Sequence, residues 1–365
     1  MNRRQFIGTS GALCAVAARS GAGEHSQRLR ILILGGTRFI GVHITELALK
    51  RGHSVTLFNR GRSAPNRFPN VELLKGDRNG QLDALRGHSW DAVIDDSGYV
   101  PRQVRLSAEL LAPHVQRYVF ISSISAYASL AKPVDESAPL GKLTDPSVET
   151  INGDTYGPLK ALCEQAAASA MPHRLMVLRP GLVVGPEDYT DRFTYWPARA
   201  ARGGPMLAPG TPAAATQFID ARDLARFTLD CIEHNTVGTF NVVTPPGHVT
   251  MGQLVAESIA AAEALAQPQP KPSAVWVPAD FLERQKVEPG TDLPMWYPAT
   301  GDDASFAEVS DARAIAAGLR ITPLAVTTRD TLAWFLKRPE SERRQLKAGL
   351  SPEREAQLLA SWRAA

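Results

Sequence analysis

The feature that most constrains the fold is a short apolar segment that runs directly into a glycine-rich turn. Residues 30–34 (RILIL) form the mainly apolar run that is typical of a buried parallel strand. The next seven residues, GGTRFIG, have glycine at the first, second and last positions, and a helical pattern then continues to Arg51. A strand, a tight turn and a helix in this order predict an α/β fold built on a parallel sheet.

This glycine turn also predicts a site for the pyrophosphate of a dinucleotide. The first glycine permits the bend, the helix N-terminus presents N–H groups to the phosphates, and the last glycine lets helix and strand pack closely. A plain tight turn is the alternative interpretation of such a motif taken alone. The residues expected to contact the cofactor here are Gly35, Gly36, Thr37, Arg38, Phe39, Ile40 and Gly41.

The end of the second predicted strand, residues 54–58, bears on which dinucleotide is bound. It leads into Asn59-Arg60-Gly61-Arg62, so the acid that would bind the 2′-hydroxyl of NAD, expected about 20 residues after the turn, is missing. Guanidinium groups, including that of Arg38 at the usual middle glycine, suit a 2′-phosphate. We therefore expect Asn59 and Arg60 to contact the cofactor and NADP to be favoured over NAD. The alternative is that these arginines are exposed and serve solubility only.

Strands and helices continue to alternate through the first half of the chain. Further strands are predicted at residues 71–75, 92–95 and 118–122, and polar residues follow each of them. Ligands of a doubly wound parallel sheet bind at the carboxyl ends of its strands. We therefore expect Asp77, Arg78 and Ser97 to contact the cofactor, with Asp77 accepting a hydrogen bond from the adenine amino group.

A tyrosine and a lysine four residues apart, Tyr156 and Lys160, occupy a segment with helical character. This spacing places both side chains on one helix face, and Pro158 suits the first turn of a helix. The lysine charge would lower the pKa of the phenol, so that Tyr156 could exchange a proton with a carbonyl or hydroxyl near neutral pH. A surface Tyr/Lys pair without a function is the alternative.

Together these segments resemble the extended short-chain dehydrogenase/reductase superfamily, of the NAD-dependent epimerase/dehydratase type. The resemblance runs from Ile31 to about Trp334 and also includes residues 122–127, 179–181, 184–186, 217–225 and 238–242. It implies that Ser123 polarises the substrate oxygen, that Tyr156 is the acid/base, and that Lys160 binds the nicotinamide ribose and lowers the tyrosine pKa. It also implies that Pro180 lines the nicotinamide pocket.

The resemblance further implies a Rossmann-type doubly wound parallel sheet with a smaller C-terminal substrate domain. The expected NAD(P)-binding domain spans residues 28–180, and a mixed substrate-binding region at 181–340 returns partly to it. Residues 341–365 are expected to form a helical tail, and residues 1–27 a leader and linker.

The loop at residues 185–197 combines aromatic residues with one arginine and several acids, which suggests a wall of the substrate site. A small aromatic core beneath a long loop is the alternative. The candidate substrate residues are Tyr99, Ser125, Arg192 and Trp196.

The N-terminal segment has the layout of a twin-arginine export signal: Arg3 and Arg4 precede a short, weakly apolar stretch and small residues. We therefore expect export to the periplasm, with a ragged cytoplasmic N-terminus as the alternative. No stretch of about 18 uninterrupted apolar residues is present, so no stable membrane insertion is expected after leader removal. Three cysteines fall at no metal-binding spacing, so no metal site is predicted.

The formal net charge of +3 is carried by residues 1–23, which contain three arginines and no acid. The rest of the chain is formally neutral and has no overall field to attract nucleic acid. This disfavours one alternative, a binding module like the chloroplast stem-loop RNA-binding proteins, whose turn resembles GGTRFIG. A cofactor sensor without turnover is another alternative, although such sensors can dispense with the tyrosine.

The favoured hypothesis is an NAD(P)-dependent enzyme that transfers hydride at a carbon bearing oxygen, on a sugar-like or small polyol substrate. Reductase, dehydrogenase, epimerase and dehydratase chemistry are all left open. Thr216 and Gln217 stand where nucleotide-sugar enzymes of this type usually carry an arginine, which argues against a nucleotide-diphosphate substrate. The resemblance also allows a homodimer.

Overall fold

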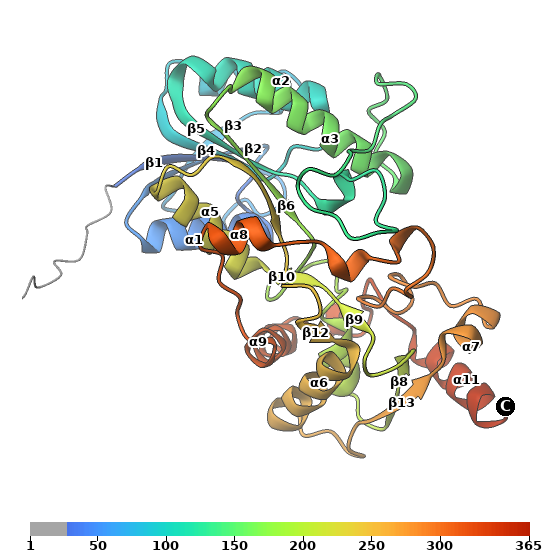
Figure 1. The fold of residues 1–365 in the computed structure, drawn as a ribbon. Helices are drawn as coiled ribbons and strands as arrows, with labels where there is room; N and C mark the ends of the chain where they lie inside the picture. The colour runs from blue at the N-terminus through green and yellow to red at the C-terminus, as the bar shows by residue number, and fades with distance from the viewer. Residues whose placement is uncertain (1–27) are drawn as a thin grey trace, which may run out of the picture.

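The computed structural model describes residues 28–365, whose main feature is a seven-stranded parallel sheet (Figure 1). The strand order is β11-β6-β5-β4-β1-β2-β3, so the direction of winding reverses between β1 and β4. The strands are β1 (Arg30–Leu34), β2 (Ser54–Asn59), β3 (Glu72–Lys75), β4 (Trp90–Asp95), β5 (Val115–Ile121), β6 (Leu175–Pro180) and β11 (Gly238–Val242). The predicted Rossmann-type doubly wound fold is confirmed.

Helices cover both faces of this sheet. One face is covered by α1 (Ile40–Lys50) and α5 (Ala221–Glu233), and the other by α2 (Pro101–Leu111) and α3 (Gly153–Ala170) (Figure 1). Strand β1 alternates between the two layers: Ile31 and Ile33 belong to the core with α1 and α5, and its leucines to the core with α2 and α3. A strand buried on both sides is what its unbroken apolar run predicts.

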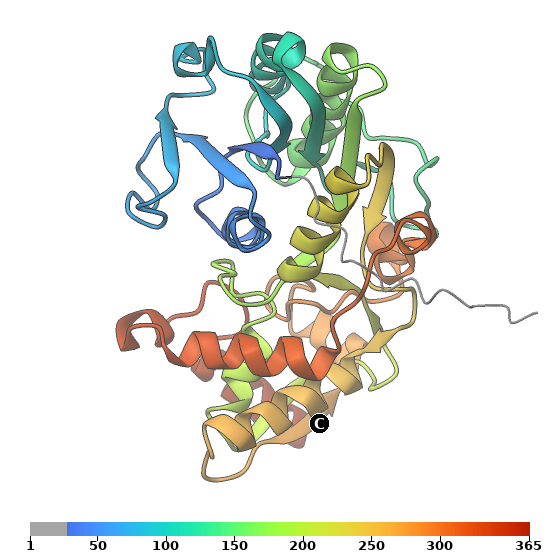
Figure 2. The same cartoon turned by 90° about the vertical axis from the view of Figure 1, so that its left-hand side faces the viewer.

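A second lobe, built mainly from residues after β6, lies beyond the α1 and α5 layer (Figure 2). Its short strands pair as β7 with β10, β8 with β13 and β9 with β12. The strands are β7 (Leu182–Val184), β8 (Pro205–Pro209), β9 (Ala215–Thr216), β10 (Phe218–Asp220), β12 (Val249–Thr250) and β13 (Ser273–Val277). The later helices are α4 (Tyr195–Ala200), α6 (Met251–Leu265), α7 (Ala279–Arg284), α8 (Ala312–Ala316), α9 (Leu324–Leu336), α10 (Glu340–Arg343) and α11 (Pro352–Arg363).

The start of α3 differs from the sequence prediction. The helix begins at Gly153, where the Asn152 side chain accepts hydrogen bonds from the backbone N–H groups of Asp154 and Thr155, each at 3.0 Å. Pro158 therefore lies inside the helix, and its prediction as a first-turn residue is wrong. The physical reason is the capping box formed by Asn152 and Thr155, which starts the helix earlier.

Two further points concern the chain as a whole. The twin-arginine leader predicted for residues 1–27 lies outside the described residues. In the part that the structure describes, none of the helices combines the length and the apolar character that crossing a membrane requires.

Candidate active site

The glycine turn between β1 and α1 is closed around the carboxyl group of Asp96, which follows β4. The Gly36 N–H donates to Asp96 Oδ2 at 3.3 Å, and both Gly35 and Gly36 have positive φ, at 123° and 83°. A Cβ atom at Gly35 would lie 1.7 Å from Asp96 Oδ1, and one at Gly41 would lie 2.1 Å from Asp96 Oδ2. Glycine is therefore required here by backbone conformation and by space.

A cavity of about 430 Å³ opens at the carboxyl ends of β1, β2, β3 and β4, beside this turn. It lies at the point where the strand order reverses, which is where doubly wound sheets bind ligands. The predicted site residues that line it are Gly35, Gly36, Thr37, Arg38, Phe39, Ile40, Asn59, Arg60, Asp77, Arg78, Ser97 and Tyr99. Its lining also includes Asp96, Gln103, Ile151 and Tyr189, which the sequence analysis did not assign to the site.

Two of the predicted cofactor residues are held by the protein itself. Arg78 is buried, and its terminal nitrogens donate to the two Asp95 oxygens at 2.5 and 2.7 Å and to Ser107 Oγ at 2.8 Å. Ser97 Oγ donates to the Leu34 carbonyl at 2.7 Å. Both side chains thus stabilise the ends of the strands that form the cavity wall.

Three arginines surround the outer end of the cavity. Arg38 stacks on the Tyr189 ring, with its guanidinium carbon 4.1 Å from the ring centroid. Arg60 and Arg62 are exposed, and within residues 28–365 the structure gives neither an acidic partner. The Asn59 side chain instead supports the turn, donating to the Gly35 carbonyl at 2.9 Å. Arg60 and Arg62 thus present unpaired positive charge where the second strand ends.

Ser123 and Tyr156 meet at the inner end of the site. Ser123 caps a single turn of 3-10 helix (Ile124–Ala126), where its hydroxyl accepts from the Ser125 N–H at 3.1 Å. Burial raises the pKa of Tyr156, while the Ser123 hydroxyl and the positive charge of Arg192 act in the opposite direction. The predicted residues Ser123 and Arg192 therefore both favour the ionised form of the Tyr156 phenol.

A close helix approach brings these groups together. A Cβ atom at Gly157 would lie 2.0 Å from the Ser125 carbonyl oxygen, so α3 contacts the Ser123–Ser125 segment directly. At Gly153, four residues earlier in the same helix, a Cβ atom would meet nothing within 4 Å. Ser125 itself is exposed.

Lys160 of α3 is buried and is hydrogen-bonded to the backbone. Its ammonium donates to the backbone carbonyls of Gly98 at 2.9 Å and Ile121 at 2.6 Å. Burial lowers the pKa of Lys160 to about 8. The net shift of the Tyr156 pKa is upward and not downward as predicted, because burial of the phenol outweighs the groups that oppose it.

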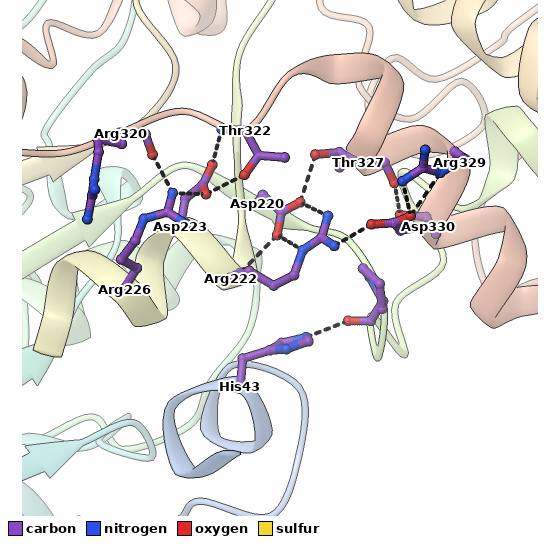
Figure 3. Close-up of polar contacts among 12 residues, drawn as sticks. His43, Asp220, Arg222, Asp223, Arg226, Arg320, Thr322, Thr327, Arg329 and Asp330 are labelled. Carbon is purple, nitrogen blue, oxygen red and sulfur yellow. Dashed lines mark hydrogen bonds and ion pairs between the residues drawn. The ribbon is translucent and has the colours of Figure 1, made fainter. Parts of the chain in front are cut away.

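A loop that we call the strap (residues 185–192) crosses from the second lobe to the glycine turn. Its Tyr189 lies edge-on to Phe39, with ring centroids 6.3 Å apart. His43 of α1 bonds the Pro186 carbonyl through Nε2 at 2.8 Å (Figure 3). Asp191 accepts from Arg338 at 2.7 Å. The strap is thus anchored to both parts of the molecule.

A network of hydrogen bonds and ion pairs joins β10, α5 and α9 (Figure 3). Asp220 caps α5 by accepting from the Arg222 N–H at 2.8 Å, and it also accepts from Thr327 of α9 at 2.7 Å. Arg222 bridges Asp220 and Asp330, each at 2.6 Å. These contacts join β10, α5 and α9, and their acids and arginines are paired with one another.

Trp196 is wrongly predicted as a substrate residue. Its side chain has no exposed surface, and its indole Nε1 donates to the Pro294 carbonyl at 2.9 Å. Phe193 and Tyr195 are also fully buried in the core of the second lobe. These three aromatic residues belong to a core, as the alternative interpretation had it, whereas Tyr189 of the same segment is exposed and lines the cavity. Pro180 is likewise buried, at the end of β6.

Sequence comparisons identify relatives of the chain. The profile of the NAD dependent epimerase/dehydratase family matches residues 31–101 and 100–243. The Bos taurus epimerase family protein SDR39U1 is 30% identical over 317 residues, which cover 78% of this chain and 98% of that protein. The Arabidopsis thaliana chloroplast stem-loop binding protein of 41 kDa b is 26% identical over 231 residues, 57% of this chain and 56% of that protein.

Solved structures with the same fold include two that contain a nicotinamide dinucleotide. Bordetella bronchiseptica WbmH in complex with NAD+ superposes with a TM-score of 0.58 at 19% identity, covering 85% of this chain and 99% of that one. Human SDR39U1 (isoform 2) with NADPH superposes with a TM-score of 0.54 at 20% identity, covering 83% and 99%. The chain belongs to the NAD-dependent epimerase/dehydratase family and has its NAD(P)-binding fold.

Proposed function

We propose that this chain is an NADP(H)-preferring enzyme that transfers hydride at a carbon bearing oxygen, on a sugar-like or small polyol substrate, with Tyr156 handling the proton. The observation that carries the proposal is the position of Tyr156, whose helix contacts the Ser123–Ser125 segment at Gly157 and whose ring lies next to a residue of the cavity lining. The Tyr99 ring, which lines the cavity, lies 6.4 Å from that of Tyr156. This proximity supports proton transfer by Tyr156 next to a bound cofactor.

The residues present fit a dinucleotide. The cavity follows the glycine turn and the N-terminus of α1, and the space at Gly35 and Gly41 admits no side chain. Backbone N–H groups at such a helix N-terminus bind phosphates. The bound nicotinamide would accept or donate the hydride. Lys160 would bind the nicotinamide ribose with the one ammonium hydrogen that the Gly98 and Ile121 carbonyls do not accept.

The raised pKa of Tyr156 bears on the proton that this residue would handle. At neutral pH the phenol is protonated, so it can donate a proton to a substrate oxygen, and the phenolate formed is stabilised by Ser123 and Arg192. Carbonyl reduction is the direction of the reaction in which a protonated phenol acts as the acid.

Substitution of Tyr156 by Phe tests this role. NADPH oxidation with a panel of aldehydes, ketoses and keto-sugars should fall by at least about 1,000-fold, while the NADPH Kd changes by less than about threefold. Tyr127→Phe is the matched control, because that buried phenol bonds Asn241 at 2.6 Å, outside the cavity lining. Retention of most of the rate in Tyr156→Phe would remove Tyr156 from the mechanism.

The preference for NADP(H) is supported by the unpaired Arg60 and Arg62 at the cavity's outer end. We expect NADPH to bind about tenfold more tightly than NADH in calorimetry at moderate salt, equivalent to about 1.4 kcal/mol. Arg60→Ala should reduce the difference between the NADPH and NADH affinities. Higher salt should also reduce it, because the contact between the arginine and the 2′-phosphate is ionic and exposed. Arg86→Ala, at an exposed site paired with Asp83, is the control. Tighter NADH binding would contradict the preference.

Two other properties are proposals with simple tests. Similarity to a stem-loop binding protein makes RNA a second candidate ligand, which the formally neutral body disfavours. A mobility shift with stem-loop RNA at physiological salt would favour RNA binding.

Export to the periplasm is tested by fusing residues 1–30 to a folded reporter. Unchanged distribution after Arg3→Lys with Arg4→Lys would exclude a twin-arginine signal.

A further inference from the structure

The carboxyl group of Asp96 occupies an unusual place for an acid, because it lies within the turn that should receive phosphates. It accepts from the Gly36 N–H, and its two oxygens fill the space next to the Cα atoms of Gly35 and Gly41. It also lines the cavity. If Asp96 were ionised, it would compete with a bound pyrophosphate for positive potential at the N-terminus of α1 and repel it.

The charged groups around Asp96 do not remove this conflict. Asp95 on β4 is engaged by Arg78, from the loop after β3, and Lys160 of α3 is held by two backbone carbonyls. From the turn and α1, Arg38 stacks on Tyr189 and His43 bonds the Pro186 carbonyl. Burial raises the pKa of Asp96 to about 7, with Asp95 adding to the rise and Gly36, Arg78 and Lys160 opposing it.

We propose that Asp96 is protonated in the dinucleotide complex, so that cofactor binding takes up a proton at this carboxyl group. The inference rests on the proposed function, because it requires a dinucleotide to bind at the turn. A neutral carboxyl group removes the repulsion and can donate its O–H to an acceptor.

The expected pH dependence follows from this change of charge. Below pH 7 the free protein already carries the proton, so binding is tightest and takes up little. Above pH 7 the free carboxyl is ionised, and each pH unit should weaken binding about tenfold until the pKa of the complex is reached. Cofactor affinity is thus highest on the acid side of neutrality.

Calorimetric titration measures the proton directly. The ligand is NADH, because the 2′-phosphate of NADPH would itself titrate in this pH range. The titrations are repeated at pH 7.5 in buffers that differ in ionisation enthalpy. We expect uptake of about three-quarters of a proton at pH 7.5, falling toward zero at pH 6. Asp96→Asn should abolish the uptake and make the Kd nearly independent of pH from 6 to 9.

Two controls identify the group responsible. Asp77→Asn removes a carboxyl group from the lining of the same cavity and should keep the pH dependence. Lys160→Arg keeps the charge but cannot titrate in this range, so uptake that survives it does not come from the lysine. If Asp96→Asn fails to fold, these two variants decide the case: proton uptake that survives both of them is assigned to Asp96, the acid of the cavity lining whose pKa is raised to about 7, and uptake lost in either one overturns the proposal.

The outcomes separate this inference from the proposed function. NADH binding without proton uptake, or uptake that persists in Asp96→Asn, overturns the role of Asp96 and leaves the enzyme proposal standing. Failure of NADH and NADPH to bind at any pH overturns both.

Discussion

The carboxyl edge of the sheet and the aromatic segment of the second lobe differ in how well the sequence predicts the surroundings of a side chain. At the sheet edge, residues from four strand ends that are far apart in sequence line one cavity, as predicted. In the second lobe, Trp196 was expected at the substrate and is buried in the core. Parallel strands bring their ends to one edge by topology alone. The surroundings of an aromatic side chain depend on how the elements pack, and the sequence around Trp196 does not specify them.

Of the substitutions that test this comparison, Trp196→Ala should have the largest effect on stability. Loss of a fully buried indole should lower the free energy of unfolding by about 3–5 kcal/mol, measured by urea denaturation. Tyr99→Ala, at a 39% exposed ring that lines the cavity, should cost less than about 1 kcal/mol. A Trp196→Phe protein with normal stability and a raised substrate KM would return this residue to the substrate site.

A smaller effect is expected where α3 approaches the serine segment. Gly157→Ala should cost about 2–3 kcal/mol of stability, because the added methyl collides with the Ser125 carbonyl, and turnover should fall as Tyr156 moves away from Ser123. Gly153→Ala in the same helix meets nothing within 4 Å and serves as the matched control. Thermal melting and single-turnover rates of the two variants make the test. Equal behaviour would show that α3 can shift without affecting the site.

The smallest effect is expected at the strap, where the two regions meet. Tyr189→Ala removes the ring that stacks on Arg38 and contacts Phe39, so NADPH affinity should fall by about fivefold, or about 1 kcal/mol. Tyr189→Phe keeps the ring and should bind nearly as the wild type does. Fluorescence titration with NADPH measures both. A loss shared by Tyr189→Phe would instead point to the phenol hydroxyl.

The parts of the candidate site that depend on short stretches of neighbouring residues could be predicted from the sequence. The glycine turn, the strand ends and the Tyr156 and Lys160 spacing can each be read from a few neighbouring residues, and the structure places them around one edge of the sheet. Asp96 and Tyr189 could have been suspected: the first directly follows a strand end and the second lies in the predicted substrate loop. Their partners, Gly36 and Arg38, are distant in sequence, and only folding brings them together.

By itself the sequence determined the parallel sheet, the glycine turn and the order of the strand ends, because periodicity and backbone conformation are local properties. The tertiary structure alone decided which charges face the cavity. It paired Arg78 with Asp95, held Lys160 on two carbonyls and buried Trp196. Electrostatic environment and burial are sums over neighbours from the whole chain, so they are settled only when the elements pack.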